Sequence, residues 1–316
     1  MDKQIVKVAC RRHDWTAALF DGKVRLPSLD LEISEQANVG VGELLRNRDL
    51  DFAECGLAGF LRARFGGARV RALPVFIRCA FRHSYIFVHA ESGIRKPKDL
   101  EGKRVGTTYG MTANVWARGL LAHEYGVRLT AIRWVNAETE DNSYGLPPGL
   151  QFEYVPKDTD LQAWLSTGKI DALVHPDVIP IELLARKNTK RLFPDAAEEE
   201  KNSYRRSGVI PVMNIIACRE EYLERLDVVR EMFQAFCRAK ELGLEKMQDS
   251  RDSGLLWYWD ALEKQQALVG DDPVPYSVEK IRRTLQTFVD LSVEHGLIPS
   301  PMRLDDLFFG DLQAGC

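Results

Sequence analysis

The segment "FRHSYIFV", residues 81–88, places a cation, an imidazole and a hydroxyl beside an apolar run that is typical of a β-strand. Buried polar groups are normally paired, so Arg82, His83 and Ser84 predict a site where these groups meet a ligand or one another. His83 is a candidate proton donor, because an unperturbed imidazole titrates near neutral pH and its neighbours could orient both ring and substrate. A hydrogen-bonded structural histidine is the alternative.

Three arginines beside apolar, strand-like segments indicate an acidic ligand. A guanidinium grips a carboxylate at two points, and the candidates are Arg12, Arg78 and Arg82. On one ideal strand Arg78 and Arg82 would share a face at a separation of about 13 Å, so they converge only if the chain turns between them. Solvated surface arginines are the alternative for each.

Two further acid/base candidates end predicted strands. Glu54 follows "DFA", of which Phe52 and Ala53 are apolar, and here its carboxylate could polarise a histidine or accept a hydroxyl proton. An acid that interacts with the dipole of a helix N-terminus is the alternative. His175 in "LVHPD" ends another strand just before Pro176, and a histidine of a turn is its alternative.

The stretch "GKRVGTTYGMTANVW" predicts a strand, a tight turn and the start of a helix. Met111, Thr112 and Ala113 open this helix, whose free N–H groups and Thr112 hydroxyl could hold a carboxylate or phosphate. An ordinary cap at Thr112 is the alternative. Gly106 and Gly110 complete neither a Walker nor a dinucleotide-binding pattern, so nucleotide binding is disfavoured.

The elements that must position these residues alternate between strands and helices in two blocks. "QIVKVAC" predicts a first strand that opens into the polar loop "RRHD", and the last third of the chain is mostly helical. We predict an α/β fold of two domains, residues 1–88 plus 219–316 and residues 89–218. The ligand site is expected in the cleft between the domains, where strands end.

The composition indicates a cytoplasmic protein that acts on a small molecule. The chain has 316 residues, 45% of them hydrophobic, and a formal net charge of −3. Lys and Arg are spread along it, which indicates neither nucleic acid nor a membrane as partner, and no segment resembles a secretory signal or a membrane span. Six cysteines without C-x-x-C pairs indicate free thiols. We expect no cofactor, leave a divalent metal open, and find homo-oligomerisation allowed but not required.

Several segments together resemble the 4,5-dihydroxyphthalate decarboxylase family. They are "FRHSYIFVHAESGIRKPKDLEGKRVG", "YGMTANVWARGLLAHEYGV", "RLFPDAAEEEKNSYRRSGVIPVMN" and "GDDPVPYSVEKIRRTLQTFV". The stretch Lys96–Gly106 is common to a broader superfamily, whereas "FRHS", "MTANVW" and "YRRSG" are narrower. The resemblance implies a type II periplasmic-binding-protein-like fold. It also implies a decarboxylase of a hydroxylated aromatic acid such as 4,5-dihydroxyphthalate.

Loss of CO2 from an aromatic ring needs a proton for the ring carbon, a base at the para hydroxyl and a cation for the remaining carboxylate. With this resemblance, His83 is the expected proton donor, and Glu54 or His175 acts at the hydroxyl. Asn214 stands where the family often has histidine, a difference expected to change the substrate and not the reaction. The expected substrate-binding residues are Arg12, Arg78, Arg82, Ser84, Met111, Thr112, Ala113 and Asn214.

Two other functions compete with a decarboxylase. A solute-binding protein would only capture an anionic aromatic or sulfonate ligand for an ABC transporter, and the lack of a signal peptide argues against it. An enzyme similar to the thiamine-pyrimidine synthases would need a lysine or histidine placed for covalent chemistry, and the sequence indicates no such residue.

Overall fold

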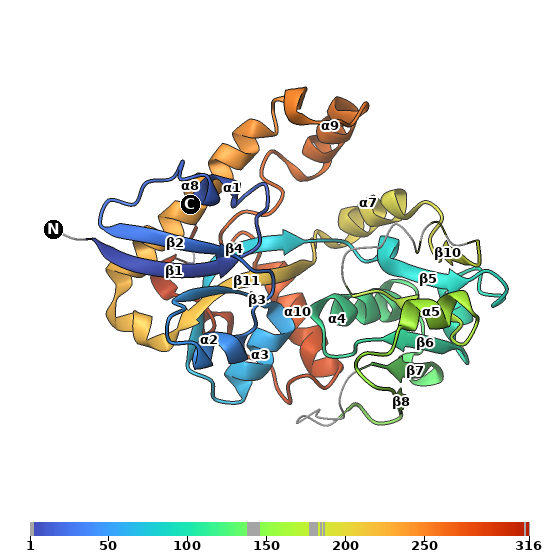
Figure 1. Ribbon diagram of the computed structural model, residues 1–316. Helices are drawn as coiled ribbons and strands as arrows, with labels where there is room; N and C mark the ends of the chain where they lie inside the picture. The colour runs from blue at the N-terminus through green and yellow to red at the C-terminus, as the bar shows by residue number, and fades with distance from the viewer. Residues whose placement is uncertain are drawn as a thin grey trace. The chain divides into compact units, whose positions relative to one another are not determined.

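The computed structural model describes residues 3–137, 146–176, 183, 185, 187–312, 314 and 315. The chain forms two compact units, each built on its own sheet (Figure 1). The first unit comprises Met1–Cys79, Val212–Leu285 and Met302–Cys316, and the second comprises Ala80–Pro211 and Gln286–Pro301.

The chain passes between the units at other positions than the predicted 88/89 and 218/219. Strand β5 (Ile86–His89) pairs within the second sheet, so the chain enters the second unit before this strand, at Ala80. Strand β11 (Val212–Arg219) pairs over its whole length within the first sheet, so the chain returns to the first unit where this strand begins. Strand pairing, which single-sequence patterns do not show, therefore sets the boundaries.

The sheet of the first unit has the order β2-β1-β3-β11-β4. Strands β2 and β3 are parallel to β1, whereas β11 is antiparallel to both β3 and β4. The remaining strands of this sheet are β1 (Gln4–Cys10), β2 (Leu29–Glu35), β3 (Phe52–Gly56) and β4 (Val70–Cys79).

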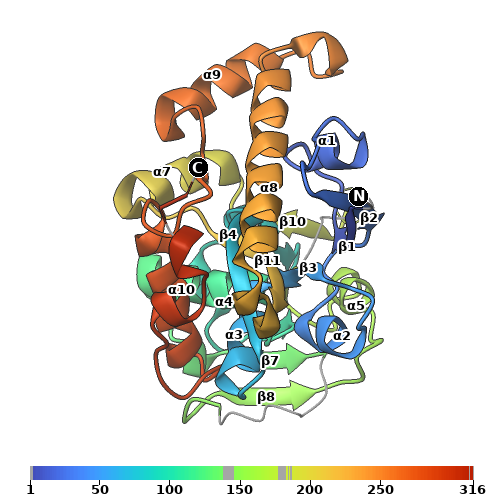
Figure 2. The same ribbon diagram turned by 90° about the vertical axis from the view of Figure 1, so that its left-hand side faces the viewer.

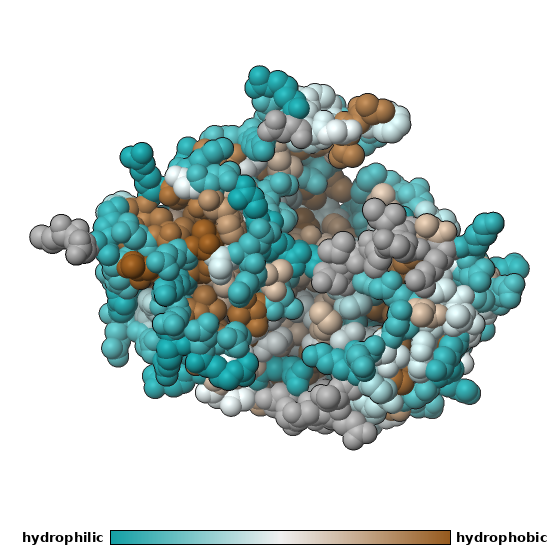
Figure 3. Space-filling model, in the orientation of Figure 1, coloured by the Kyte–Doolittle hydropathy of each residue, from teal (hydrophilic) through white to brown (hydrophobic). Residues whose placement is uncertain are grey.

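Helices cover this sheet and extend beyond it. Helices α2 (Val41–Arg46) and α3 (Leu57–Phe65) pack on β3 and β11, whereas the long α8 (Leu226–Lys246) packs on β4 and on α1 (Ala17–Phe20) (Figure 2). Helix α9 (Tyr258–Val269) follows α8. Hydrophilic residues cover much of the face shown in Figure 3, but apolar side chains are exposed at the start of α9. They are Leu255, Leu256, Trp257 and Trp259.

The sheet of the second unit has the order β10-β5-β9-β6-β7-β8, with β6, β7, β8 and β9 parallel and β5 antiparallel to β9 and β10. Strand β5 is buried on both faces, because Ile86 and Val88 enter one apolar core and Phe87 enters the other. The strands besides β5 are β6 (Arg104–Thr107), β7 (Arg133–Asn136), β8 (Gln151–Tyr154), β9 (Ala172–Val174) and β10 (Thr189–Arg191).

The helices of this unit include α4 (Thr112–Gly119), α5 (Leu161–Ser166), α7 (Ala196–Ser207) and most of α10 (Arg282–Glu294). Helix α7 carries the "YRRSG" motif at its end, where Gly208 adopts the left-handed conformation that stops a helix. Part of this motif is therefore explained by backbone geometry. No described helix is long and apolar enough to cross a bilayer.

Candidate active site

Several polar side chains gather at one edge of the first unit's sheet. Strands β1, β3 and β4 all run toward this edge and end at Cys10, Gly56 and Cys79, and the antiparallel β11 begins there. Ligand sites of α/β proteins commonly lie beyond such strand ends. We call this the carboxyl edge of the first unit.

Pairing of β11 with its two neighbours brings predicted site residues together. Asn214 lies opposite Gly56 on one side and opposite Arg78 on the other. Glu54 lies two positions before Gly56, so it shares a face of the sheet with Asn214 and Arg78. The sheet thus places a carboxyl, an amide and a guanidinium on one face at this edge.

Glu54 is the buried acidic group of the carboxyl edge. Its Oε2 accepts a hydrogen bond of 2.7 Å from the Arg11 backbone N–H, and its Oε1 lies 3.7 Å from Arg11 Nε. Burial raises the pKa of Glu54, although the nearby guanidinium groups of Arg11 and Arg78 act to lower it. A carboxyl with a raised pKa can hold a proton nearer to neutral pH than an ordinary one, as the predicted acid/base role requires.

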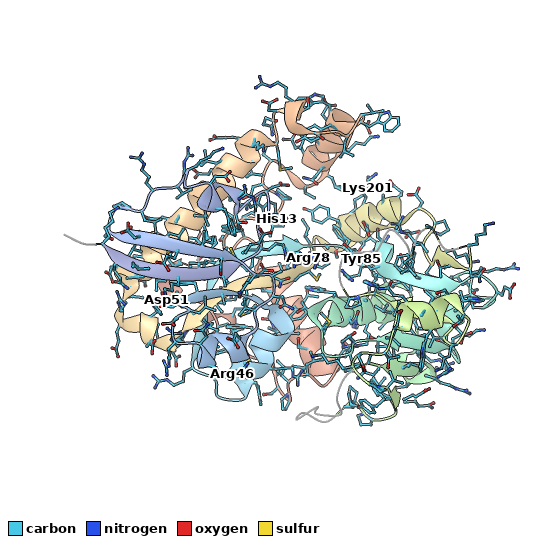
Figure 4. The ribbon with its side chains drawn as sticks, in the orientation of Figure 1. His13, Arg46, Asp51, Arg78, Tyr85 and Lys201 are labelled. Carbon is cyan, nitrogen blue, oxygen red and sulfur yellow. The ribbon has the colours of Figure 1, made fainter. Side chains whose placement is uncertain are left out.

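The loop after β1, residues 11–16, lies next to Glu54 and is held by its own hydrogen bonds. The His13 N–H donates to Thr16 Oγ1 at 2.9 Å, and the Thr16 hydroxyl donates to the Arg11 carbonyl at 2.7 Å. Burial and the positive charges of Arg11 and Arg78 lower the pKa of His13, while Asp14 opposes them. Figure 4 shows His13 and Arg78 at this end of the first unit.

Helix α8 supports this loop from behind. Lys240 lies 4.3 Å from the Tyr276 ring centroid and 4.9 Å from that of Trp15, and its ammonium pairs with Asp272 at 2.6 Å. Gly243 lies so close to the loop that a Cβ there would be 2.4 Å from a backbone oxygen, that of Asp14. The position of the loop therefore depends on tight contacts with α8.

In the second unit, the structure brings Arg82 and His175 together, and the Arg82 side chain binds the His175 backbone. The Arg82 Nη2 donates to the His175 carbonyl at 2.6 Å, and the guanidinium carbon lies 3.8 Å from the Tyr85 ring centroid. The His175 Nε2 lies 3.2 Å from the Gln162 side-chain nitrogen. Both residues are buried, so Arg82 is less suited to a carboxylate clamp than the part-exposed Arg78.

His83 lies among aromatic rings with 1% of its surface exposed. Its ring centroid is 5.0 Å from that of Phe193 and 5.9 Å from that of Tyr125. Burial lowers the pKa of His83 to about 4, so the imidazole is neutral at pH 7. Its expected role as proton donor stays a prediction, and these surroundings are typical of a core histidine.

The other predicted residues of the second unit have local roles. The Ser84 N–H and hydroxyl both bind Glu200 Oε1, at 3.0 and 2.8 Å, and so tie this turn to α7. The predicted helix start is confirmed: α4 begins at Thr112. Its N-cap is Met111, which offers no side-chain cap. Thr112 is therefore not the ordinary cap considered above.

The structure places Arg12 differently from its neighbour Arg11. Arg12 is exposed and pairs with Asp21 at 2.5 Å, whereas Arg11 turns toward Glu54. The sequence interpretation missed Arg11 and His13, although both stand in the polar segment directly after the first strand. That position was the available signal, because residues just beyond a strand end reach the carboxyl edge.

The described residues do not bring three His, Cys, Asp or Glu side chains together as a metal site requires. Cys10, Cys55, Cys79 and Cys218 are free thiols, as expected, but Cys237 is disulfide-bonded, which corrects the expectation for that residue. Burial raises the pKa of the Cys55 thiol to about 12, so this thiol is no nucleophile at neutral pH.

Comparisons with known proteins agree with the motifs of the sequence. The model of the family described as "NMT1/THI5 like" matches residues 27–144. A 4,5-dihydroxyphthalate decarboxylase of Comamonas testosteroni is 28% identical over 98% of this chain and 97% of its own length. One of Pseudomonas putida is 29% identical over 56% of this chain and 72% of its own length.

Solved structures with this fold include a binding protein and an enzyme. The periplasmic aliphatic sulphonate binding protein SsuA from Escherichia coli superposes with a TM-score of 0.60 at 16% identity, covering 99% of both chains. The desulfurization enzyme DSZB superposes with a TM-score of 0.54 at 14% identity, covering 97% of this chain and 96% of its own. The two-domain, periplasmic-binding-protein-like fold is thus confirmed, and the chain is similar over nearly its whole length to one protein named 4,5-dihydroxyphthalate decarboxylase.

Proposed function

We propose that this protein is a decarboxylase of a hydroxylated aromatic carboxylic acid, with 4,5-dihydroxyphthalate as the first substrate to test. The names of both sequence relatives support this reaction. The observation that carries it is the carboxyl edge of the first unit, where a buried Glu54 with a raised pKa lies beside Arg11 and Arg78. Such an edge combines attraction for an acidic ligand with a group that can carry a proton.

In the proposed reaction, Arg78 binds the carboxylate that remains on the ring, because its part-exposed guanidinium shares a face with Glu54 and Asn214. Glu54 in its protonated form supplies the proton. The bond between the ring carbon and the departing carboxylate breaks, and its electron pair stays with the ring carbon. That carbon takes the proton from Glu54, CO2 leaves, and the Glu54 carboxylate regains a proton from water.

Glu54 is a better candidate for the proton donor than His83, although both are buried. A proton donor must hold its proton at the working pH. Burial shifts the two groups in opposite senses, raising the pKa of Glu54 and lowering that of His83 to about 4. At neutral pH, His83 is therefore a neutral imidazole, which is a very weak acid.

A solute-binding protein for an aromatic or sulfonate anion is the second candidate function. The fold itself does not decide between the two, because it occurs in the sulfonate-binding protein and in the desulfurization enzyme alike. Anion binding at the carboxyl edge would serve either function. Only the proton-transfer step separates them, so a turnover measurement is required.

The deciding experiment measures CO2 release from a panel of hydroxylated benzoates and phthalates, with and without a chelator. Glu54→Gln keeps an acceptor for the Arg11 N–H and should lower turnover by roughly 10²- to 10⁴-fold, whereas loss of Arg78 in Arg78→Gln should chiefly weaken binding. Arg46→Gln is the control, since Arg46 is 75% exposed and pairs with Glu43 (Figure 4). Tight binding without CO2 release by the unmodified protein would favour the solute-binding function.

A further inference from the structure

His13 is a part-exposed titratable group of the carboxyl edge, and it has no role in the reaction proposed above. The backbone on both sides of it is fixed. Its N–H donates to Thr16 Oγ1, and its carbonyl accepts from the N–H groups of Thr16 and Ala17, at 2.9 and 2.8 Å. Thr16 itself is fully buried. The imidazole is consequently presented from a rigid turn and not from a mobile loop.

The hydrogen bonds of the ring determine which nitrogen carries its proton. The Trp15 backbone N–H donates to His13 Nδ1 at 3.4 Å, and the Trp15 ring packs edge-on against the imidazole at 5.4 Å between centroids. Because Nδ1 accepts this bond, the proton of the neutral ring resides on Nε2. The Nε2–H is therefore the group that a ligand would meet.

Burial is the first cause that keeps the His13 ring neutral, because it lowers the pKa of the imidazole. Arg11 and Arg78 face it with positive charge, Asp14 faces it with negative charge, and the net effect with burial is a lowered pKa. Beside two guanidinium groups, which are the natural partners of carboxylates, a neutral N–H donor is suited to a different ligand atom. The hydroxyl or phenolate oxygen of the aromatic ring is such an atom.

We propose that His13 contacts the substrate and donates a hydrogen bond from Nε2 to a ring hydroxyl oxygen, so that it selects hydroxylated aromatic acids over unsubstituted ones. This inference rests on the proposed function, because it takes the aromatic acid as the ligand of the carboxyl edge. His13 takes no part in protonating the ring carbon, since its imidazole only donates a hydrogen bond to the hydroxyl oxygen. His13 thereby acts on substrate choice, whereas Glu54 acts on turnover.

Two substitutions of His13 separate a contact through Nε2 from a structural role through Nδ1. A Gln side chain places its amide N–H near the position of Nε2, whereas an Asn side chain places its amide near Nδ1 and reaches no farther. His13→Asn therefore keeps a partner for the Trp15 N–H and loses the donor to the ligand. His13→Gln keeps the donor and loses that partner.

The test measures binding of 4,5-dihydroxyphthalate and of phthalate by calorimetry, with Glu54→Gln present in every protein so that turnover is slow during the measurement. Without a change at His13, the dihydroxy acid should bind about 10-fold more tightly, the usual worth of one good hydrogen bond. His13→Asn should abolish this preference, and His13→Gln should retain most of it. Because the preference is a ratio within one protein, a general loss of stability does not imitate it.

A preference that persists in His13→Asn would overturn the proposal, and so would its loss in both variants, which would remove the assignment to Nε2. Failure of the Glu54→Gln protein to bind either acid would overturn it as well. The proposed function fails in a different way, namely when the unmodified protein binds the dihydroxy acid with the expected preference but releases no CO2. The two failures are therefore distinguishable.

Discussion

Replacing Gly243 by alanine tests whether the loop of residues 11–16 must lie where it does for activity. A Cβ at Gly243 would be 2.4 Å from the Asp14 carbonyl oxygen and 3.3 Å from the Trp15 Cα, both backbone atoms. Real Cβ atoms keep at least 3.0 Å, so the loop or α8 must move by about 0.6 Å or more. His13 and Arg11 would move with the loop.

The expected loss of stability is small and the expected loss of activity is not. Alanine is preferred over glycine inside a helix by about 1 kcal/mol, whereas overpacking costs about 1–3 kcal/mol. The net change in the free energy of unfolding is thus a destabilisation of about 0–2 kcal/mol. Misplacement of site groups by about 1 Å can cost about 100-fold, so kcat/KM should fall roughly 10- to 100-fold.

The measurements are CO2 release and urea denaturation of the same preparations. Gly59→Ala is the matched control, because Gly59 is an exposed glycine of α3 with no atom within 4 Å of the added Cβ. This control should gain up to about 1 kcal/mol of stability without loss of activity. If Gly243→Ala loses no more activity than Gly59→Ala, the position of the loop is not critical and the site assignment to it is refuted.

Two predictions concern pH and the buried titratable groups. The pKa of His83 is lowered to about 4 from the 6.5 of a free imidazole, so between these two pH values the unfolded chain binds a proton at this ring and the folded chain does not. The contribution of His83 to the free energy of unfolding should therefore fall by about 3 kcal/mol between pH 6.5 and 4. In urea denaturation the fall in stability should be smaller by this amount in His83→Phe and unchanged in the surface variant His123→Gln. A 10²-fold loss of turnover in His83→Phe would instead restore His83 as the proton donor. Glu54 has a raised pKa, so its ionisation opposes folding above pH 4.5, and Glu54→Gln should gain stability relative to the unmodified protein between pH 4 and 7. An unchanged difference over that range would contradict the raised pKa.

Local signals in the sequence were sufficient to predict individual elements. The β-branched run "QIVKVAC" forms β1, and the glycines before Met111 precede a helix that begins at Thr112. Neighbouring residues decide such features, through hydrophobic pattern and backbone freedom. The α/β class follows from the order of these elements, and the structure confirms it.

Partners distant in the sequence decide which predicted site residues are available. Glu54 meets Arg11, 43 residues away, and Arg82 donates to a carbonyl 93 residues away. Residue type alone does not show whether an arginine is engaged in this way or faces a ligand. For this reason the three candidate arginines, equivalent in the sequence, differ in the structure: Arg12 pairs with Asp21, Arg82 binds backbone, and Arg78 lies beside Glu54.

The charges at the carboxyl edge also explain how one fold could serve both binding and catalysis. Arg11 and Arg78 lower the pKa of Glu54 while burial raises it. An anion that binds the two guanidinium groups offsets their effect and adds negative charge, and both changes raise the pKa of Glu54 further. Under the proposed function, a dianionic phthalate would thus load Glu54 with the proton that decarboxylation consumes. A sulfonate monoanion brings half that charge and has no carboxylate to lose, so at the same edge it would be bound and released unchanged.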